Sequence, residues 1–474
     1  MKKAVAWTAA AKYGKALFQL LFAAILSRIL TPEEYGTVAV INVFVVFFQL
    51  FCDMGFGTAV IQDKQLTGKQ INDIFSWTVY LGLLLQMIFI VVSFPLASFY
   101  EDSIYIPLGI ILSFSLLFNA LNMIPNAIML REKRFKSITY RTLVASVVAS
   151  LLTVLLALKG LGVYALALQS LFVAIIIFVW NEVSSKLRFV LKPAAESIKR
   201  IWGYSFYQFL SQFLNYFNRN FDSLLIGKFF SKADLGQYNK SYQLMHLPIA
   251  YIPGIVGPAL HPILSEHQQD PSYIFKANLK MLKILSLLGC YISVFLFFAA
   301  EELILILFGH QWVDAVVPFR FLALSVWFQL STNTVGPIYQ SIGNTKLMFK
   351  SIICSSVIIL GCIITGCVLG SINSVAALVA LGYLINYFVT YFILTKFAFK
   401  ESFIEFIKNF WQEAVFFVVL LGIAFIPLNI PNMVLSLLVK FVVLTAVYVM
   451  LLIVFKQYKH FMAFMPKKLR NHIK

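Results

Sequence analysis

Polar side chains recur at helical spacing inside a long apolar stretch of the chain. Between residues 201 and 226 they step by 4, 3, 4 and 3, which places them on one face of an α-helix. The members of this stripe are Gln208, Gln212, Asn215, Arg219 and Asp222. Amides hydrogen-bond hydroxyl groups, and a guanidinium binds carboxylate or phosphate. The stripe therefore predicts a wet helix face that holds a polar or anionic ligand.

A matching stripe lies 200 residues upstream at steps of 4, 3 and 4: Thr8, Lys12, Lys15 and Gln19. Adding 200 to these positions gives the first four members of the stripe above. Hydrogen bonding between membrane helices needs no charge, and embedded acids are too few to neutralise these cations. The basic members and one later cation are therefore predicted to line a cleft that receives an anionic group: Lys12, Lys15, Arg219 and Arg320.

Further amides and titratable groups occur on other apolar segments, including a run of Ser115, Asn119, Asn122 and Asn126. Burying such groups at membrane depth is costly, so they normally face a bundle interior or a water-filled cavity. The amides predicted to line the cleft are Gln19, Asn42, Gln49, Asn119, Asn122, Gln208, Gln212, Asn215, Gln329 and Asn333. The candidates for ion coupling are Asp53, Asp222 and His246.

Structural interpretations compete with these functional ones. A lone amide often serves only to hydrogen-bond neighbouring membrane helices. Asp222 lies one turn from Arg219 and is placed to be its ion-pair partner. His246 has a side chain that titrates near neutral pH, but a single buried histidine is more often hydrogen-bonded structure.

The elements that position these residues follow from composition. The chain has 474 residues, of which 60% are hydrophobic and 12% charged. Soluble proteins carry about 25% charge, so a water-exposed globule, a disordered chain and a disulfide-rich secreted domain are excluded. At about 20 apolar residues per crossing, we predict an all-α polytopic membrane protein of about 14 transmembrane helices. The predicted spans are 12–30, 37–60, 74–98, 107–130, 142–158, 163–181, 201–226, 237–262, 284–300, 315–335, 351–369, 375–395, 411–427 and 434–455.

The net charge of +18 is mainly a signal of membrane topology. Most of the 38 lysines and arginines fall in loops on one side of the membrane if the N-terminus is cytoplasmic, as the positive-inside rule requires. This distribution predicts that both termini are cytoplasmic and argues against nucleic acid as a partner. The lysines predicted to lie on the outer side are Lys159, Lys228, Lys232 and Lys240.

The sequence also contains an internal repeat. SRILTPEEYG at 27–36 matches GKFFSKADLG at 227–236 in the placement of a base, a hydroxyl residue, an acid and a glycine, and FKSI occurs at 135–138 and 349–352. These matches predict two parallel six-helix repeats plus two extra C-terminal helices. The predicted domains are an N-terminal lobe at 1–199, a C-terminal lobe at 200–400, and a segment at 401–474 with two additional spans and a basic tail. Parallel repeats of this kind characterise transporters that bind at the repeat interface.

Motifs for enzyme chemistry are missing from the sequence. It contains no GxxxxGK[ST], HExxH or GxSxG. Its five cysteines lie at none of the usual metal spacings. We therefore expect a protein that is not an enzyme and that needs no cofactor or metal.

Several segments carry a family resemblance: SRILTPEEYG, DMGFGTAVIQDKQLT at 53–67, REKRFKS at 131–137, GLGVYALALQSL at 160–171, LGQYNKSYQLMHLP at 235–248 and HPILSEHQQD at 261–270. The chain resembles polysaccharide-transport flippases of the Wzx type. More narrowly, it resembles the lipopolysaccharide, colanic-acid and teichuronic-acid exporter branch of the multidrug/oligosaccharidyl-lipid/polysaccharide superfamily. These motifs are mostly turns and helix ends, so the resemblance indicates the fold and does not identify individual substrate-binding residues.

The resemblance implies two six-helix lobes that alternate between inward-open and outward-open states. The implied cargo is an undecaprenyl-pyrophosphate-linked oligosaccharide, which moves from the cytoplasmic to the outer leaflet of a bacterial plasma membrane. Implied partners are membrane lipids, a polysaccharide polymerase and glycosyltransferases. On this reading the cations receive the pyrophosphate and the amides bind sugar hydroxyls.

Two other functions remain open from the sequence. A drug or organic-cation antiporter of the same superfamily needs embedded acids, which are scarce here. A membrane-embedded sugar transferase needs acids on folded loops, and the predicted loops are short. The energy source is also open, because either the membrane potential or ion antiport can drive export.

Overall fold

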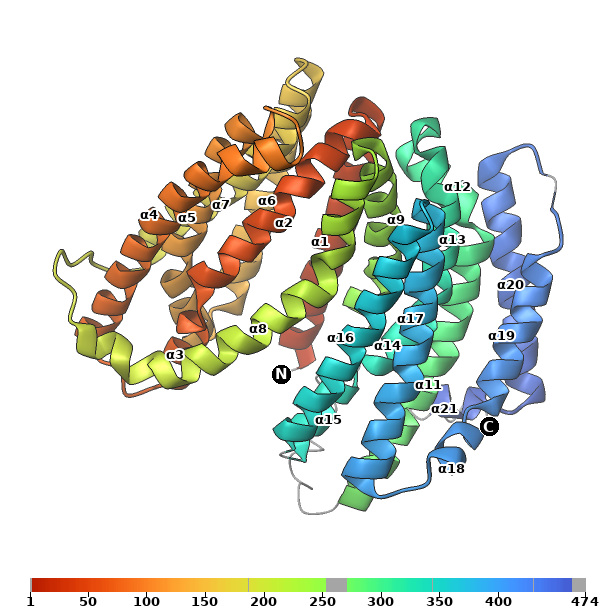
Figure 1. The fold of residues 1–474 in the computed structure, drawn as a ribbon. Helices are drawn as coiled ribbons and strands as arrows, with labels where there is room; N and C mark the ends of the chain where they lie inside the picture. Colours follow the sequence, from red (N-terminus) through yellow and green to blue (C-terminus); the bar gives the residue numbers. More distant parts are fainter. Residues whose placement is uncertain (1, 186, 253–270, 343, 429, 463–474) are drawn as a thin grey trace. The chain divides into compact units, whose positions relative to one another are not determined.

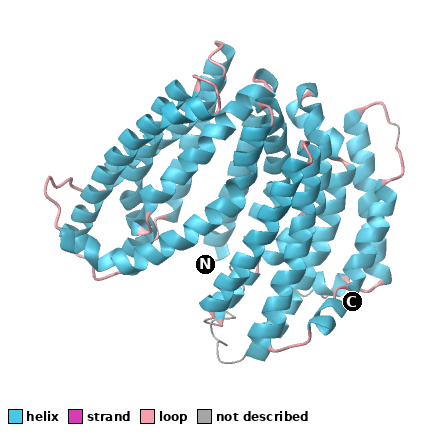
Figure 2. Cartoon of the chain, viewed as in Figure 1, coloured by secondary structure: helices cyan, strands magenta, loops and turns pink. Residues whose placement is uncertain are grey.

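The computed structural model describes residues 2–462 apart from 186, 253–270, 343 and 429. In that part of the chain every regular element is a helix (Figure 2). The predicted all-α polytopic architecture is therefore confirmed. The motif at 261–270 lies outside the described residues, as do the side chains of Lys12, Lys15, Gln208, Asn215 and Arg219.

The chain divides into two compact units, Met1–Gly236 and Gln237–Lys474. In the first unit α4 packs on α5, and α7 packs on both α5 and α6 (Figure 1). The helix α2 packs on α5 and α8. The helices that begin in this unit are α1 (Lys2–Ile29), α2 (Pro32–Asp53), α3 (Phe56–Gln62), α4 (Gly68–Phe99), α5 (Tyr105–Arg131), α6 (Phe135–Leu158), α7 (Val163–Ser184), α8 (Ala195–Phe229) and α9 (Lys232–Tyr251).

In the second unit α16 packs on α17, and α11 packs on α13, α14 and α19. Its elements after α9 are α11 (Pro271–Phe298), α12 (Ala300–Phe308), η1 (His310–Ala315), α13 (Val316–Leu324), α14 (Val326–Thr332), α15 (Val335–Ser341), α16 (Thr345–Val368), α17 (Ile372–Ile393), η2 (Leu394–Phe399), α18 (Phe403–Lys408), α19 (Trp411–Ala424), α20 (Met433–Val454) and α21 (Tyr458–Met462).

Each predicted span falls on one or more of these helices, apart from residues 253–262 of the eighth span, which lie outside the described residues. Among the described residues, nine helices are long and apolar enough to cross a membrane, and His310–Leu324 with Val326–Tyr339 forms a further pair bent by 45°. Ala16–Ile29 and Trp411–Ala424 are shorter apolar helices. The polar stripe of α8 lowers its hydropathy, which explains why a helix of 35 residues is not among the apolar spans.

The two repeated turns have the same capping geometry. Before α2, the Thr31 backbone N–H donates to Glu34 at 2.7 Å, and the Glu34 N–H donates to the Thr31 hydroxyl at 3.3 Å. Before α9, the Ser231 N–H donates to Asp234 at 3.2 Å, and the Asp234 N–H donates to the Ser231 hydroxyl at 3.0 Å. This reciprocal arrangement satisfies backbone donors that a helix N-terminus leaves open.

The first turns of α2 and α9, both within the first unit, approach each other through glycine. A Cβ atom on Gly36 would lie 2.6 Å from the carbonyl carbon of Lys232, and one on Gly236 would lie 2.8 Å from that of Pro32. The close approach is therefore reciprocal. It requires the glycine that the sequence repeats at both positions.

Two ion pairs fix the C-terminal helices α19 and α20 to the second unit. The Lys283 ammonium on α11 lies 2.9 Å from Glu413 on α19, and the Lys440 ammonium on α20 lies 2.5 Å from Glu302 on α12. Glu413 is the charged residue of α19, and Lys440 is the charged residue of α20. Since breaking a buried pair leaves an uncompensated charge, these contacts specify where the two helices pack.

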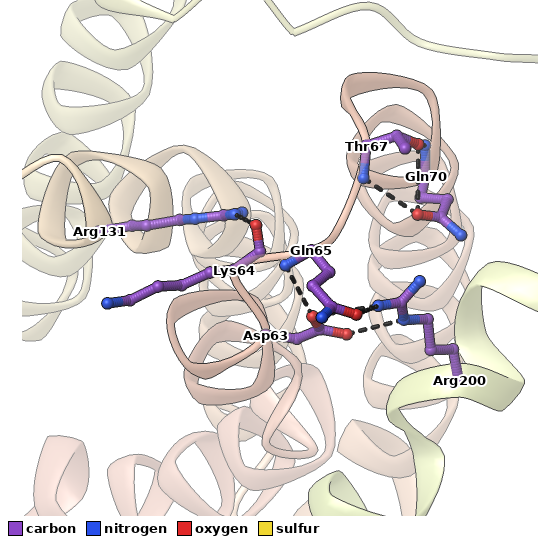
Figure 3. A network of polar contacts seen from close by, with 7 residues as sticks. All are labelled: Asp63, Lys64, Gln65, Thr67, Gln70, Arg131 and Arg200. Atoms are coloured by element: carbon purple, nitrogen blue, oxygen red, sulfur yellow. Dashed lines mark hydrogen bonds and ion pairs between the residues drawn. The ribbon is translucent and has the colours of Figure 1, made fainter.

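The loop between α3 and α4 is tied to the start of α8 by a polar network (Figure 3). The Arg200 Nε donates to Asp63 at 2.7 Å, and an Arg200 amino group donates to the same carboxylate at 3.2 Å. An Arg131 amino group donates to the Lys64 carbonyl oxygen at 2.6 Å. The hydrogen bonds from Arg200 and from the Gln65 backbone hold the pKa of Asp63 below its usual value.

Charge reversal tests whether Asp63 and Arg200 form a stabilising pair. We expect Asp63→Arg alone to lower the melting temperature of the detergent-solubilised protein slightly, because the pair is partly exposed. Adding Arg200→Asp restores the attraction and should recover the loss. Because the pKa of Asp63 is lowered on folding, the contribution is present at neutral pH and is lost as the pH falls through that lowered pKa. A double variant no more stable than the single one would contradict the pairing.

Candidate functional site

A cavity of about 520 Å³, lined by both polar and apolar residues, lies inside the first unit. Residues of α2, α3, α5, α6 and α7 line it. Its polar lining consists of Gln49, Asp53, Thr58, Asn119, Asn122, Asn126 and Arg141. The structure thus brings together four residues that the sequence proposed from separate spans: Gln49, Asp53, Asn119 and Asn122.

A break in the second predicted span shapes one wall of this cavity. The helix α2 ends at Asp53, and the next two residues adopt left-handed backbone angles, with φ of 34° at Met54 and 74° at Gly55. Glycine adopts this conformation freely, whereas methionine does so at a cost. The chain then restarts as α3, so Asp53 and Thr58 line the same cavity from either side of the break. Interrupted helices of this kind often form binding sites in transporters.

Arg141 on α6 is the cation of the cavity and is only 3% exposed. Its guanidinium donates to the Asn126 side-chain oxygen at 2.8 Å and also to the Asn181 side-chain oxygen. The Asn181 amide donates to the Asn122 oxygen at 2.8 Å, and Asn122 donates to the Ala174 carbonyl oxygen at 2.9 Å. Amides on α5 and α7 therefore fix the position of the Arg141 side chain.

This network leaves one nitrogen of the Arg141 guanidinium without a hydrogen bond. Its Nε is buried and has no hydrogen-bond partner among the described residues. Within the same part of the chain, Arg141 makes no ion pair. A buried charge without a counter-ion is costly, and in membrane proteins such a group usually marks a ligand or ion pathway. The cavity lining therefore contains a fixed cation beside amides, and one N–H of that cation has no partner among the described residues.

Four other sequence candidates of the first unit have described side chains, and these lie outside the cavity lining. Gln19 and Gln212 are exposed, and Asn42 is half-buried. Asp222 is buried and accepts a hydrogen bond from the Ser223 backbone at 2.7 Å. Their assignment to a cationic cleft stays a prediction.

The candidates of the second unit are already engaged within it. Arg320 pairs with Glu301 at 3.5 Å, and the ring of His246 stacks on that of Tyr242 at 6.2 Å. Gln329 is buried and donates to the Ser325 hydroxyl at 2.8 Å. Asn333 is exposed and donates to the Ile249 carbonyl oxygen at 3.5 Å. Their roles in ligand binding also stay predictions.

The sequence did not indicate Arg141 or Asn181 as site residues. The predicted span 142–158 leaves Arg141 in the preceding basic loop, whereas α6 begins at Phe135 and includes it. The sequence does place Arg141 at steps of four from two small residues, Ala145 and Ala149, and the structure shows that both alanines are fully buried. That spacing puts the arginine on the buried face of its helix.

The described residues contain no group of histidine, cysteine, aspartate and glutamate side chains able to hold a metal ion. The polar atoms of the cavity are mostly amides. This lining suits hydrogen bonding of a polar organic ligand.

A comparison with protein families decides the family of this chain. Residues 25–317, more than half of its length, match the family described as "Polysaccharide biosynthesis protein". The chain belongs to this family. The matched range includes every residue that lines the cavity.

The relatives of known name have low sequence identity to this chain, but the alignments cover most of both proteins. The chain is 24% identical to the teichuronic acid biosynthesis protein TuaB of Bacillus subtilis, over 72% of this chain and 71% of that protein. It is 20% identical to the lipopolysaccharide biosynthesis protein WzxC of Escherichia coli, over 82% and 79% of the two chains. Among solved structures, the lipid II flippase MurJ in an inward closed conformation aligns with a TM-score of 0.78 at 14% identity, covering 95% of this chain and 99% of that one. This last likeness establishes the fold.

Proposed function

We propose that this membrane protein is a flippase that moves lipid-linked oligosaccharide repeat units from the cytoplasmic to the outer leaflet of a bacterial plasma membrane. Family membership over residues 25–317 supports a role in polysaccharide biosynthesis. One relative, from Rhizobium meliloti, is named a succinoglycan biosynthesis transport protein, and it is 22% identical over 73% of this chain. We extend the proposal to an undecaprenyl-pyrophosphate carrier, alternating access and cytoplasmic termini.

The observation that carries the proposal is the amide-lined cavity with its buried cation. Asn119, Asn122 and Gln49 offer donors and acceptors suited to sugar hydroxyls. Arg141 offers a donor to an oxyanion or hydroxyl group through its unpartnered Nε. A saccharide entering this cavity loses its hydration, and the fixed amides and the guanidinium replace those hydrogen bonds.

Outward movement of an anionic carrier group requires no ATP hydrolysis by this chain. An inside-negative membrane potential favours export of negative charge by about 2.3 kcal/mol per charge per 100 mV. In this proposal Lys12, Lys15, Arg219 and Arg320 receive the pyrophosphate. Asp53, Asp222 and His246 remain candidates for coupling to an ion gradient.

The buried Arg141 argues against the alternative of an organic-cation antiporter. A cationic drug in this cavity would face an unneutralised guanidinium, and like charges repel strongly at low dielectric. Asp53 lines the same cavity, but a single carboxylate does not give the acidic lining that a cation site needs.

Complementation tests the cationic residues outside the cavity. The variants Lys15→Ala and Arg219→Ala are expressed in a strain that lacks this gene. Each should reach less than about a tenth of the polymer export that the unaltered protein gives, since each loses a charge-assisted contact of about 1.5–3 kcal/mol. Export is measured as surface polysaccharide at matched protein abundance. The matched control is Lys346→Ala, which removes an exposed lysine and should export normally.

Full export by both alanine variants would contradict the predicted cationic cleft. Accumulation of lipid-linked repeat units on the cytoplasmic face in the deletion strain is expected in either case. If those intermediates fail to accumulate there, the flippase function itself is wrong.

A further inference from the structure

Two adjoining cavities lie at one end of the first unit, where α4 and α8 both end. One has a volume of about 650 Å³ and an almost wholly apolar lining that includes Phe44, Val92, Leu96, Leu224 and Leu225. The other has a volume of about 310 Å³ and is polar. Both are lined by Tyr100 and Lys228, so an apolar groove continues into a polar pocket. A molecule with a hydrocarbon chain and a polar head has this same division.

The polar pocket contains a buried tyrosine hydroxyl that has no hydrogen-bond partner among the described residues. Tyr105 lines it and is 1% exposed, and the hydroxyl has no hydrogen-bond partner among the described residues. A buried hydroxyl without a partner costs free energy. This observation is independent of the groove's shape and also indicates a ligand with an acceptor oxygen.

The charges of the pocket divide into a paired set and an unpaired set. Lys232 forms an ion pair with Asp102. Burial alone would raise the pKa of Asp102, but the hydrogen bonds from Lys232 and from the Ile104 backbone, together with the Lys232 charge, outweigh burial and hold this pKa below its usual value, so the pair is charged. Lys228 donates to the Phe99 carbonyl oxygen at 2.6 Å and lies 4.2 Å from the Phe99 ring centroid.

Two opposite charges then remain for a ligand. Among the described residues, neither Lys228 nor Glu101 forms an ion pair, and both line the pocket. An ammonium has three donors, and the carbonyl contact of Lys228 uses one of them. Lys228 can therefore bind an anion while Glu101 accepts N–H groups from a cation.

We propose that this groove and pocket bind a zwitterionic phospholipid with a primary ammonium, of the phosphatidylethanolamine type. The phosphate lies against Lys228 and the Tyr105 hydroxyl, the ammonium against Glu101, and an acyl chain fills the groove beside Val92. Phosphatidylglycerol lacks the cation, and the quaternary ammonium of phosphatidylcholine has no N–H to donate. The site also gives a reason why Lys228 and Lys232 lie on the predicted outer side of the membrane, where the positive-inside rule expects few lysines. It does not depend on the proposed function.

Lipid retention by the purified full-length protein tests this assignment. The protein is reconstituted in vesicles of phosphatidylethanolamine, phosphatidylglycerol and phosphatidylcholine in equal parts, extracted in mild detergent and analysed by native mass spectrometry. Phosphatidylethanolamine should be retained in clear excess. Lys228→Gln and Glu101→Gln should each lower its retention about tenfold, and Tyr105→Phe about fivefold. The control Lys159→Gln removes another predicted outer lysine, which is exposed, and should leave retention unchanged.

Variants that fill the groove separate chain binding from headgroup binding. Val92→Trp should lower the retention of every phospholipid, because it occupies the space of the acyl chain. Equal retention of the three lipids would overturn the proposal. Unchanged retention of phosphatidylethanolamine by Tyr105→Phe would also overturn it, because this variant removes only the hydroxyl oxygen. Stronger retention of added undecaprenyl phosphate would also overturn it, since the pocket would then serve the carrier lipid.

Discussion

Arg141→Met is expected to reduce polymer export at least tenfold while the protein still folds. The guanidinium is the cation of the described cavity lining, and its Nε has no protein partner among the described residues. If this group binds the cargo, its loss removes a charge-assisted hydrogen bond of about 1.5–3 kcal/mol, which corresponds to a tenfold or larger effect. Methionine fills similar space with an apolar, flexible chain.

The substitution should also lower stability, although not so far that the protein fails to fold. The side-chain oxygens of Asn126 and Asn181 lose their donor, and each unsatisfied buried acceptor costs about 1–3 kcal/mol. Removal of an unpaired buried charge offsets part of this cost. Arg141→Lys keeps the charge but not the planar fork that reaches both asparagines, so it should export at an intermediate level.

Export is measured in the deletion strain, and folding is measured as the melting temperature of the purified protein. The matched control is Arg134→Gln, which removes a nearby arginine that is exposed and paired with Glu132 at 2.6 Å. That variant should export normally. An Arg141→Met protein that exports at the unaltered level would exclude this cavity as a cargo site.

The helical architecture was accessible from the sequence because a membrane imposes it. Backbone groups in lipid must be bonded within the segment, so long apolar runs become helices. The turns at 27–36 and 227–236 were also accessible, because hydroxyl and acid at fixed spacing determine the reciprocal caps of Thr31 with Glu34 and Ser231 with Asp234. The ion pairs of Glu413 and Lys440 required the tertiary structure, since their partners lie more than a hundred residues away.

The candidate site was accessible only in part, for a similar reason. Periodicity assigns Asn119, Asn122 and Asn126 to one face of α5 but does not say which helix that face meets. Arg141 was missed because a charged residue near a predicted span end is normally at the membrane surface. Its position is stabilised by Asn126 and by Asn181, which is 40 residues away. Likewise, no sequence pattern places Lys228 and Tyr105 around the same pocket.

Gly36→Ala is expected to lower the free energy of unfolding by about 3 kcal/mol or more, the upper end for overpacked positions. The added Cβ would lie 2.6 Å from the carbonyl carbon of Lys232. That neighbour is backbone, which cannot rotate away as a side chain can, so α2 and the start of α9 must separate. Separation also strains the two capped turns that precede these helices.

Gly236→Ala should have an effect of similar size, because its Cβ would lie 2.8 Å from the carbonyl carbon of Pro32 in the same contact. Once the first substitution has separated the helix starts, the second adds a smaller steric clash. The double variant should therefore lose less free energy of unfolding than the sum of the two single losses. Abundance in membranes and melting temperature in detergent measure all three variants.

Gly203→Ala is the matched control for this helix contact. Gly203 lies on α8 in the same unit, and nothing lies within 4 Å of an added Cβ. Alanine favours a helix over glycine by about 1 kcal/mol, so this variant should be as stable as the unaltered protein or slightly more so. If Gly36→Ala matched this control, the helices would not be held at glycine distance, and the repeated glycine would reflect only the common origin of the two turns.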